Sequence, residues 1–250
     1  MAARGRPTPQ LETGERPRYR DPIPAAVDRG INPYLKSHAE QAPEGITAAE
    51  AWTWRGRWAE RFGRTAPLVL EIGPGDGAFL VELARRSPEV DHVAVEIRYK
   101  RVVLGAQKLR AAGIRNAVVS RYHAAYLDDL FEPGSLAGIW VNHPDPWPKE
   151  RHEKNRLISR WFLRDVVSLL APGGVFRLKS DFRPNVDRAA ELLAHDEDGT
   201  PAEALPLEIT GRADDVTTGP APWPDDIETG YQRKFRLKGL PVSAIELRRR

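Results

Sequence analysis

The alternation of short apolar runs with helical patterns, which begins at Leu68, is the feature of this sequence that most restricts its fold. Apolar runs of strand length recur between stretches with helical spacing, and such runs are typical of buried strands. Strands are expected at 68–72, 92–96, 116–120, 138–141 and 175–179, and helices at 79–86, 99–112, 124–131, 153–170 and 185–195. Strands separated by helices form right-handed crossovers. The pattern predicts an α/β fold with a mainly parallel sheet and helices on both faces.

The N-terminal part of the chain lacks this rhythm. Residues 1–45 contain many prolines and arginines, and we expect this basic extension to be partly disordered. Residues 47–62 are predicted to form a helix, because a threonine N-cap is followed by aromatic residues at every fourth position from Trp54 to Phe62. We interpret the aromatic stripe as a packing face. The chain of 250 residues is thus expected to hold one domain, at 46–250, behind the extension.

The composition excludes several classes of function. The chain contains no cysteine, which removes disulfides, cysteine zinc sites, iron–sulfur clusters and the thiolate of pyrimidine carbon-5 methylases. No metal site is predicted. There is no apolar run of membrane-spanning length and no signal-peptide core, so we expect a cytoplasmic protein, either monomeric or homodimeric.

Charge is unevenly distributed along the C-terminal part of the chain. Residues 233–250 carry seven Lys or Arg against one Glu, whereas residues 196–228 carry ten acids against one Arg. This segregation predicts one polyanion-facing side, the alternative being a flexible basic tail beside an acidic loop. Prolines and acids also indicate that residues 197–226 form a long loop, before a final strand at 242–247.

A glycine-rich loop follows the first predicted strand. Gly73, Gly75 and Gly77 permit a tight turn and let a ligand approach the backbone where the next helix presents its amide end. The second predicted strand ends at Glu96, 19 residues after Gly77. A carboxylate at that place can accept hydrogen bonds from both hydroxyls of a ribose. The pair of features predicts a nucleotide-type cofactor.

Two cofactors agree with this loop. A dinucleotide is allowed, because Gly73, Gly75 and Ala78 satisfy the loose dinucleotide fingerprint. S-adenosylmethionine is favoured by Glu71, which places negative charge near the methionine amino group and would repel a pyrophosphate. A glycine turn without a ligand is the third alternative.

The fourth predicted strand breaks at Asn142 into a segment with prolines at positions 144, 146 and 148. Proline fixes its own φ and disfavours helix at the residue before it, so the segment is predicted to be a stiff extended turn. That turn presents Asp145 and Trp147 at the carboxyl end of a strand, where open parallel sheets bind ligands. Trp147 is interpreted as a packing residue or as a ring that stacks on a base.

Cationic residues follow the turn directly. Lys149, Arg151, Lys154 and Arg156 are interpreted as phosphate contacts, or else as the solvated start of a helix. No role is assigned to His152.

Together, these motifs resemble the bacterial tRNA (guanine-N7)-methyltransferase family. The resemblance is carried by LEIGPGDG from Leu70, VAVEIR from Val93, NHPDPWPKERHEKNRL from Asn142, LAPGGVFRLKSD from Leu170 and TGYQRKF from Thr229. The block around PDPWPK is its most specific part, and the resemblance extends from about Leu68 to the end of the chain.

The resemblance implies a Rossmann-like class I methyltransferase fold with a seven-stranded sheet, S-adenosylmethionine as donor, and a guanine in the tRNA variable loop as acceptor. By position, it implies donor contacts from the glycine loop, Glu71 and Glu96, with Asp145 as the catalytic residue between donor and base. It assigns RNA contacts to Lys149, Asp181 and the segment Thr229, Tyr231 and Gln232; Arg151 joins these as a phosphate contact.

The chain departs from the family pattern at two sites, and its N-terminal region has no counterpart in that pattern. Where the family has an acid that reads the adenine amine, this chain has His123, which can still accept a hydrogen bond. Gln232 stands where a glutamate is expected, and it keeps an acceptor without the charge. The donor contact is therefore assigned to His123, and the acceptor specificity is left open.

The expected chemistry requires little from the protein. Guanine N7 offers a lone pair in the ring plane, so attack on the sulfonium methyl needs alignment rather than a general base. The ring gains positive charge, which Asp145 or Asp181 could stabilise. The alternatives are a methylase of another RNA or of an exocyclic amine, a methyltransferase-like RNA-binding protein without catalysis, and a dinucleotide oxidoreductase.

Overall fold

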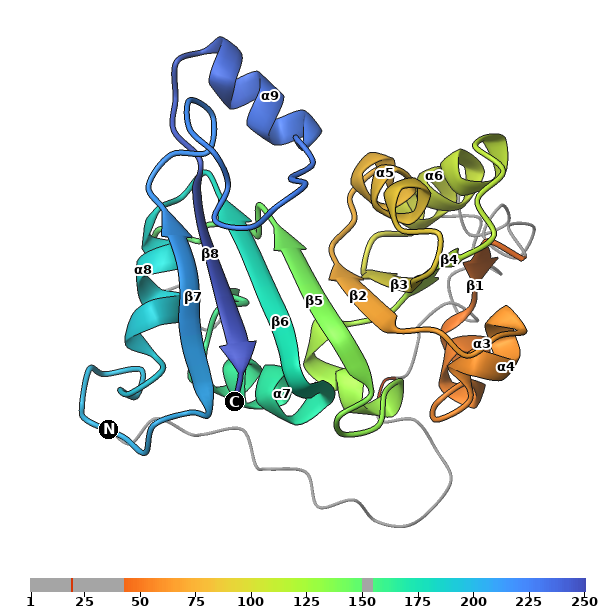
Figure 1. Cartoon of the computed structure of the whole chain (residues 1–250), viewed down its shortest axis with the longest axis horizontal. Coiled ribbons are helices and arrows are strands. Elements are labelled where there is room, and N and C mark those ends of the chain that lie inside the picture. The colour runs from red at the N-terminus through yellow and green to blue at the C-terminus, as the bar shows by residue number, and fades with distance from the viewer. Residues whose placement is uncertain (1–18, 20–42, 150–154) are drawn as a thin grey trace.

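The computed structural model describes residues 19, 43–149 and 155–250 of the chain. Within this part, an eight-stranded sheet has the order β1-β4-β3-β2-β5-β6-β8-β7 (Figure 1). The strands are β1 (Gly45–Ile46), β2 (Leu68–Ile72), β3 (Asp91–Glu96), β4 (Ala117–Arg121), β5 (Leu136–Asn142), β6 (Leu170–Ser180), β7 (Leu207–Ala213) and β8 (Ser243–Arg249). The helices are α3 (Ala48–Thr53), α4 (Trp58–Phe62), α5 (Ala78–Arg86), α6 (Tyr99–Ala111), α7 (Arg160–Leu169), α8 (Pro184–Glu191) and α9 (Gly230–Leu237), with the 3₁₀ helix η1 (Ala124–Asp129).

The connections around β2 create the point where a ligand site is expected. β1 to β6 form parallel pairs, whereas β8 lies antiparallel to both β6 and β7. The chain passes from β2 outward to β3 and β4, and then returns to the other side of β2 at β5. Open α/β sheets bind ligands at the carboxyl ends of the strands at such a reversal.

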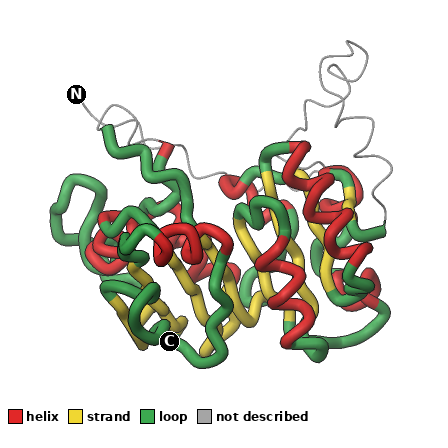
Figure 2. Tube along the Cα trace, turned by 90° about the horizontal axis from the view of Figure 1, so that it is seen from above, coloured by secondary structure: helices red, strands yellow, loops and turns green. Residues whose placement is uncertain are grey.

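Helices cover both sides of the sheet (Figure 2). On one face, Leu70, Ile139 and Phe176 are completely buried in a cluster that also includes α7 and α8. On the other face, α5 and α6 pack over β3 and β4 around Ala94 and Val119. Successive strand residues point to opposite faces, so Glu71 lies on the face opposite to Leu70. This alternation brings Glu71 to the side on which α5 begins.

The segment between β7 and α9 covers the rest of the second face. Trp223 is 6% exposed and meets Trp140 of β5 edge to face, with ring centroids 5.5 Å apart. The Arg177 guanidinium lies 4.9 Å from the centroid of Trp140. The segment is therefore packed against the sheet, although it contains many acids.

The five strands expected between residues 68 and 180 are present, and the final strand is β8. The expected loop at 197–226 is wrong in part, because it contains β7, which pairs with β8 along the edge of the sheet. Most β7 side chains are exposed or half-buried, in keeping with an edge position. A strand of this kind lacks the apolar alternation that reveals a strand in a sequence.

Three expected helices have different bounds or form. The helix expected at 47–62 is divided into α3 and α4, because Gly56 adopts a φ of 71° between them. The stretch expected to be helical from 124 is the 3₁₀ helix η1. α7 starts only at Arg160, where Ser159 caps it by accepting a hydrogen bond from the Phe162 N–H.

The fold class is confirmed, with one addition to the expected seven strands. The short strand β1 pairs with β4, so the sheet begins at Gly45, one residue before the expected domain start. Apart from Tyr19 and residues 43–45, the predicted N-terminal extension lies outside the described residues. No helix of the described chain is both long and apolar enough to cross a membrane.

Candidate active site

A cleft of about 590 Å³ opens at the carboxyl ends of β2, β3 and β5. Its walls come from the loop between β2 and α5, the end of β3, the turn after β5, and the start of α9. These segments are far apart in sequence. The cleft thus unites the glycine loop with the proline turn and with the late TGYQRKF motif.

The glycines of the loop have different structural roles. Gly73 and Gly75 line the cleft with φ values of 70° and 58°, which residues with a Cβ rarely adopt. Gly77, with a φ of 80°, is the N-cap of α5 and is not part of the cleft lining. A Cβ on Gly77 would lie 2.6 Å from the Cα of Gly105, which sits in α6. Gly77 therefore permits the close approach of α5 and α6 that supports the loop.

Glu71 places a buried carboxyl in the cleft wall. Glu71 is 2% exposed, and its Oε2 has no hydrogen-bond partner in the described structure. Burial raises the pKa of Glu71 to about 8, with the Asn142 amide opposing the shift and the charges of Glu96 and Asp76 adding to it. Both polar side-chain atoms of Asn142 are buried without a hydrogen bond of full geometry, although the amide lies near enough to Glu71 to oppose the rise of its pKa. A cationic amino group of a ligand could donate to Oε2 of Glu71 and to Oδ1 of Asn142, the two acceptors that lack a partner.

Glu96 provides a second carboxylate at the end of β3. Its Oε1 accepts a hydrogen bond of 2.9 Å from the Arg98 N–H. Burial raises the pKa of Glu96, while hydrogen bonds from backbone N–H groups and the charges of Arg98 and Arg101 oppose the rise. Glu96, Arg98 and Arg101 all line the cleft. The sequence argument identified the carboxylate but not the two arginines beside it.

The proline turn forms the opposite wall. Asp145 is exposed and lines the cleft, as does the half-buried Trp147. Positive φ values at His143 (51°) and Trp147 (38°) bend the chain on either side of Asp145. The Trp147 carbonyl accepts a hydrogen bond from Nε of Arg156, which helps to fix the turn. Arg156, interpreted above as a phosphate contact, thus has a structural partner.

Of the remaining cationic residues, Lys149 is exposed and does not line the cleft. Arg151, His152 and Lys154 lie outside the described residues.

The side chains of Asp181 and Thr229 both contact His143, a residue to which the sequence argument assigned no role. Nδ1 of His143 lies 3.1 Å from Oδ1 of Asp181, and Nε2 lies 2.8 Å from Oγ1 of Thr229. The hydrogen bond with His143 is the main reason that the pKa of Asp181 is lowered. The Tyr231 ring, 53% exposed, stacks on the His143 ring at 5.4 Å. Thr229, Tyr231 and His143 line the cleft.

Gln232 does not lie where a direct substrate contact would require. It is 4% exposed and is absent from the cleft lining. Its Oε1 accepts from Nζ of Lys179, and its Nε2 donates to the Val216 carbonyl at 2.9 Å. Gln232 also completes a capping box with Thr229 at the start of α9. The expected contact with RNA is replaced by a structural contact inside the protein.

His123 is likewise not brought into the cleft. It is exposed, and its Nδ1 accepts a hydrogen bond of 3.0 Å from the Ala125 N–H at the start of η1. The predicted donor contact of His123 is thus not part of the described cleft lining.

The expected basic surface is divided between two ends of the sheet. Arg233 and Lys234 lie on α9, beside the cleft, whereas Arg248, Arg249 and Arg250 follow β8 to its far end (Figure 1). The antiparallel direction of β8 separates the two groups. The basic residues at 233–250 therefore do not form one group, and of these only the α9 group adjoins the cleft; the polyanion-facing side stays a prediction. Among the described residues, no cluster of His, Asp and Glu is arranged to hold a metal ion.

Comparisons with known proteins agree with this arrangement. The sequence profile of a family described as putative methyltransferase matches residues 65–205. The chain has the fold of the 16S rRNA methyltransferase KamB, with a TM-score of 0.55 and 17% identity over 78% of this chain and 93% of that one.

Proteins related in sequence identify the family more specifically. A tRNA (guanine-N(7)-)-methyltransferase of Lactiplantibacillus plantarum is 32% identical over 81% of this chain and 89% of its own length. A protein of the same name from Listeria welshimeri is 30% identical over 86% of this chain and 94% of its own length. With this extent of similarity, and with the family's motifs gathered around one cleft, the chain belongs to the tRNA (guanine-N(7)-)-methyltransferase family.

Proposed function

We propose that this protein transfers a methyl group from S-adenosylmethionine to N7 of a guanine in tRNA. The observation that carries the proposal is the shared cleft: Glu71 and Glu96 line it together with Asp145 of the proline turn. A methyl donor and an aromatic acceptor must bind side by side in one cleft. This cleft is lined both by residues suited to bind the donor and by residues suited to bind the acceptor.

The donor side is formed by the glycine loop and two carboxyl groups. S-adenosylmethionine supplies an electrophilic methyl group on a sulfonium. Glu71 is proposed to pair with the amino group of the donor, since its buried Oε2 has no hydrogen-bond partner among the described residues. Gly73 and Gly75 leave space for close approach to their backbone, and Glu96 is proposed to accept from the ribose hydroxyls.

The acceptor side is formed by the proline turn and the start of α9. Asp145 is proposed to lie against the guanine ring and to stabilise the positive charge that develops as N7 is methylated. No residue is required to remove a proton from N7 before attack. Trp147 and Tyr231 offer aromatic surface in the cleft on which a base can stack.

Contacts with the RNA backbone are assigned to cationic residues near this wall. Lys149 is exposed beside the turn, and Lys234 of α9 lines the cleft. Arg151 is included on the sequence argument alone. Such residues supply affinity and orientation without reading the sequence.

Incubation with donor labelled in its methyl group and with unmodified tRNA tests the proposal. Nucleoside analysis should then show label in 7-methylguanosine. Label in an exocyclic amine would instead support the rival methylase. Donor binding without transfer to any tRNA would contradict the enzymatic assignment.

A further inference from the structure

α9 forms one wall of the cleft, so its position relative to the sheet determines the shape of the acceptor side. Thr229, Gly230, Tyr231 and Lys234, at or near its N-terminus, line the cleft. α9 has only eight residues, and its buried surface is small: within the helix, Gln232 is the single buried residue. A short polar helix of this kind depends on specific anchors to keep its place.

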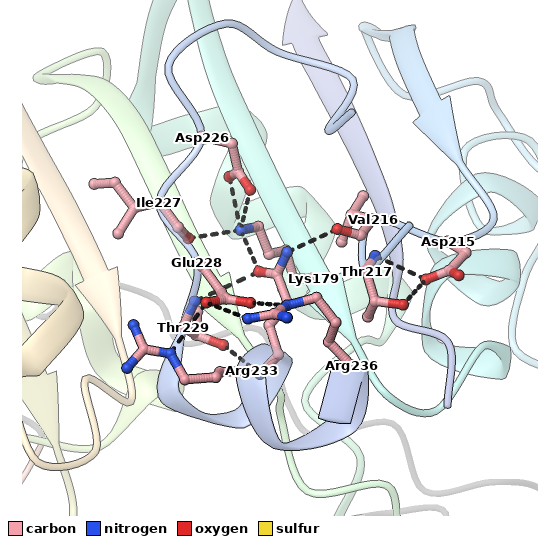
Figure 3. A network of polar contacts seen from close by, with 11 residues as sticks. Lys179, Asp215, Val216, Thr217, Asp226, Ile227, Glu228, Thr229, Arg233 and Arg236 are labelled. Atoms are coloured by element: carbon pink, nitrogen blue, oxygen red, sulfur yellow. Dashed lines mark hydrogen bonds and ion pairs between the residues drawn. The ribbon is translucent and has the colours of Figure 1, made fainter. Parts of the chain in front are cut away.

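One anchor is a lysine buried within the molecule (Figure 3). Lys179 of β6 is 0% exposed, and its Nζ lies 2.7 Å from Oδ2 of Asp226, 2.8 Å from the Ile227 carbonyl and 2.9 Å from Oε1 of Gln232. All three donors of the ammonium are thus used. This cluster fastens the segment before α9, and α9 itself, to the end of β6.

The other anchor is His143, which belongs to the cleft wall. Its ring spans Asp181 after β6 and Thr229 at the N-cap of α9, at 3.1 Å and 2.8 Å. The same Thr229 Oγ1 accepts the capping hydrogen bond from the Gln232 N–H at 2.9 Å. His143 is placed for this by a left-handed backbone conformation, with a φ of 51°. Residues other than glycine rarely adopt this conformation, and where they do, the surrounding contacts hold them in it.

We infer that His143 is a positioning residue for the acceptor guanine: it ties the proline turn to α9 and so fixes Tyr231 and Lys234 opposite the glycine loop. The inference rests on the proposed function and assigns a role to a residue that the motifs did not identify. His143 acts through Thr229 and through its stacked contact with Tyr231. It does not act on the donor side, which is built from β2 and β3.

A proton-transfer role is not needed to explain the geometry. Methylation of N7 creates a cation without breaking an N–H bond, so no proton has to leave the ring at that step. Both hydrogen bonds of the His143 ring are made with protein side chains.

Two variants remove the bridge, one with the aromatic stack on Tyr231 retained and one without it. His143→Phe keeps an aromatic ring beside Tyr231 but removes both hydrogen bonds. His143→Asn tolerates the left-handed backbone conformation and is too short to link Asp181 with Thr229. The matched control is His195→Phe, because His195 is exposed just after α8 and the Nδ1 of its ring lies 3.1 Å from the Glu191 carbonyl, away from α9.

The KM for tRNA should rise about fivefold to tenfold in both His143 variants, the size of coupling typical within one hydrogen-bond network. The dissociation constant of S-adenosylhomocysteine, measured by calorimetry, should remain unchanged. The double variant His143→Phe/Thr229→Val should have the same KM for tRNA as Thr229→Val alone, since both substitutions remove the link between His143 and Thr229. Hydrogen exchange of the α9 amides should accelerate in both His143 variants and not in the His195 variant.

Several results would overturn the inference. They are an unchanged KM for tRNA in both variants, an equal loss of donor affinity, additive effects in the double variant, and unaltered exchange in α9. The exchange measurement needs no activity, so it remains decisive if a variant is too weak to assay. Wild-type protein that forms no 7-methylguanosine would instead refute the proposed function, and the two failures are thereby distinguished.

Discussion

The burial of Glu71 opposes folding, and the same carboxyl is proposed to bind the donor. Its burial favours the neutral acid, and its pKa rises to about 8. Most unfolded chains ionise a glutamate near pH 4.3. The folded protein thus holds a proton that the unfolded chain releases across this interval. Glu71 therefore destabilises the folded protein by an amount that grows as pH rises through that window and stays constant above it.

Replacing Glu71 with Gln should therefore stabilise the donor-free protein at alkaline pH. The wild-type melting temperature, relative to that of Glu71→Gln, should fall as pH rises from about 4 to about 8 and then stay level. Thermal melts across this range measure the difference. The exposed Glu89 provides the control, because Glu89→Gln should show no such trend.

The same carboxyl should link donor binding to pH. Pairing with a cationic amino group requires ionised Glu71, so the affinity of wild-type protein for S-adenosylhomocysteine should increase as pH approaches about 8. In Glu71→Gln the affinity should be lower and should lack this dependence. Calorimetry in buffers of different ionisation enthalpy would detect the released proton; its absence would argue that Glu71 does not meet the amino group.

Asp145 carries the acceptor-side chemistry in the proposal. Asp145→Asn keeps the shape of the side chain and removes its charge, so the single-turnover rate should fall about 10²-fold, as for loss of other groups that stabilise transition-state charge. The melting temperature should hardly change, because Asp145 is exposed. Asp198→Asn, in an exposed turn distant from the cleft, is the control. A rate equal to wild type in Asp145→Asn would remove Asp145 from the mechanism.

At this scale, the sequence predicted residues whose place is set by local chain geometry. Glu71, Gly73, Glu96 and Asp145 line the cleft because each lies at or close to the carboxyl end of a strand. Gln232 does not, because its orientation depends on Lys179, a residue 53 positions earlier. No local pattern specifies such a pairing. His143 was missed for the same reason.

At the scale of elements, α9 and the end of β6 behave as one unit. Burial lowers the pKa of Lys179, and Asp226 counteracts this by stabilising the ammonium. Removing one partner of a buried ion pair is generally more costly than never having had the pair. The unit is therefore expected to tolerate few changes in charge.

Gln232→Glu tests this expectation, since it introduces the residue that the family pattern favours. A glutamate would turn an oxygen toward the Val216 carbonyl, to which Gln232 now donates at 2.9 Å. The free energy of unfolding should fall by about 1–3 kcal/mol, the cost of an unsatisfied buried group. Urea denaturation measures the change, and Gln107→Glu on the exposed side of α6 is the control. Equal or greater stability in Gln232→Glu would show that the cluster can rearrange.

Elements with strong periodicity were predicted well, and those stabilised by distant contacts were not. Several of the expected parallel strands contain short apolar runs, at 68–70, 93–95 and 117–119, which are typical of strands covered on both faces. β7 depends on pairing with β8, and α9 depends on the anchors at Lys179 and His143. Neither the pairing of β7 nor the anchoring of α9 produces a periodic pattern in the sequence.

At the scale of the whole molecule, the two ends of the sheet carry different groups of residues. Parallel strands deliver the cleft residues to one end, whereas β8 carries Arg248 to Arg250 to the other. RNA that occupies the cleft is thus expected to depend on the cations beside the proline turn and on α9. It should be insensitive to cations at the opposite end.

Charge reversal at two positions measures this asymmetry. Lys149→Glu combined with Arg151→Glu should weaken tRNA binding and reduce the slope of log K against log salt by about two, one for each phosphate contact. Arg115→Glu, on an exposed residue just before β4 at the amino end of the strands, should change neither quantity. Binding titrations at several salt concentrations give both slopes. An unchanged slope in the double variant would exclude phosphate contacts at these two residues.

The contact between Gly77 and Gly105 has a practical consequence because it is unequal in its two directions. A Cβ on Gly77 would collide with the α6 backbone, but one on Gly105 would meet Val119 at 3.6 Å and the Cα of Gly77 at 3.8 Å, both ordinary distances. Glycine within a helix costs roughly 0.5–1 kcal/mol relative to alanine. Gly105→Ala should hence yield a thermostabilised form, melting about 2 °C higher, with the donor loop undisturbed. Such a form would suit crystallisation with tRNA.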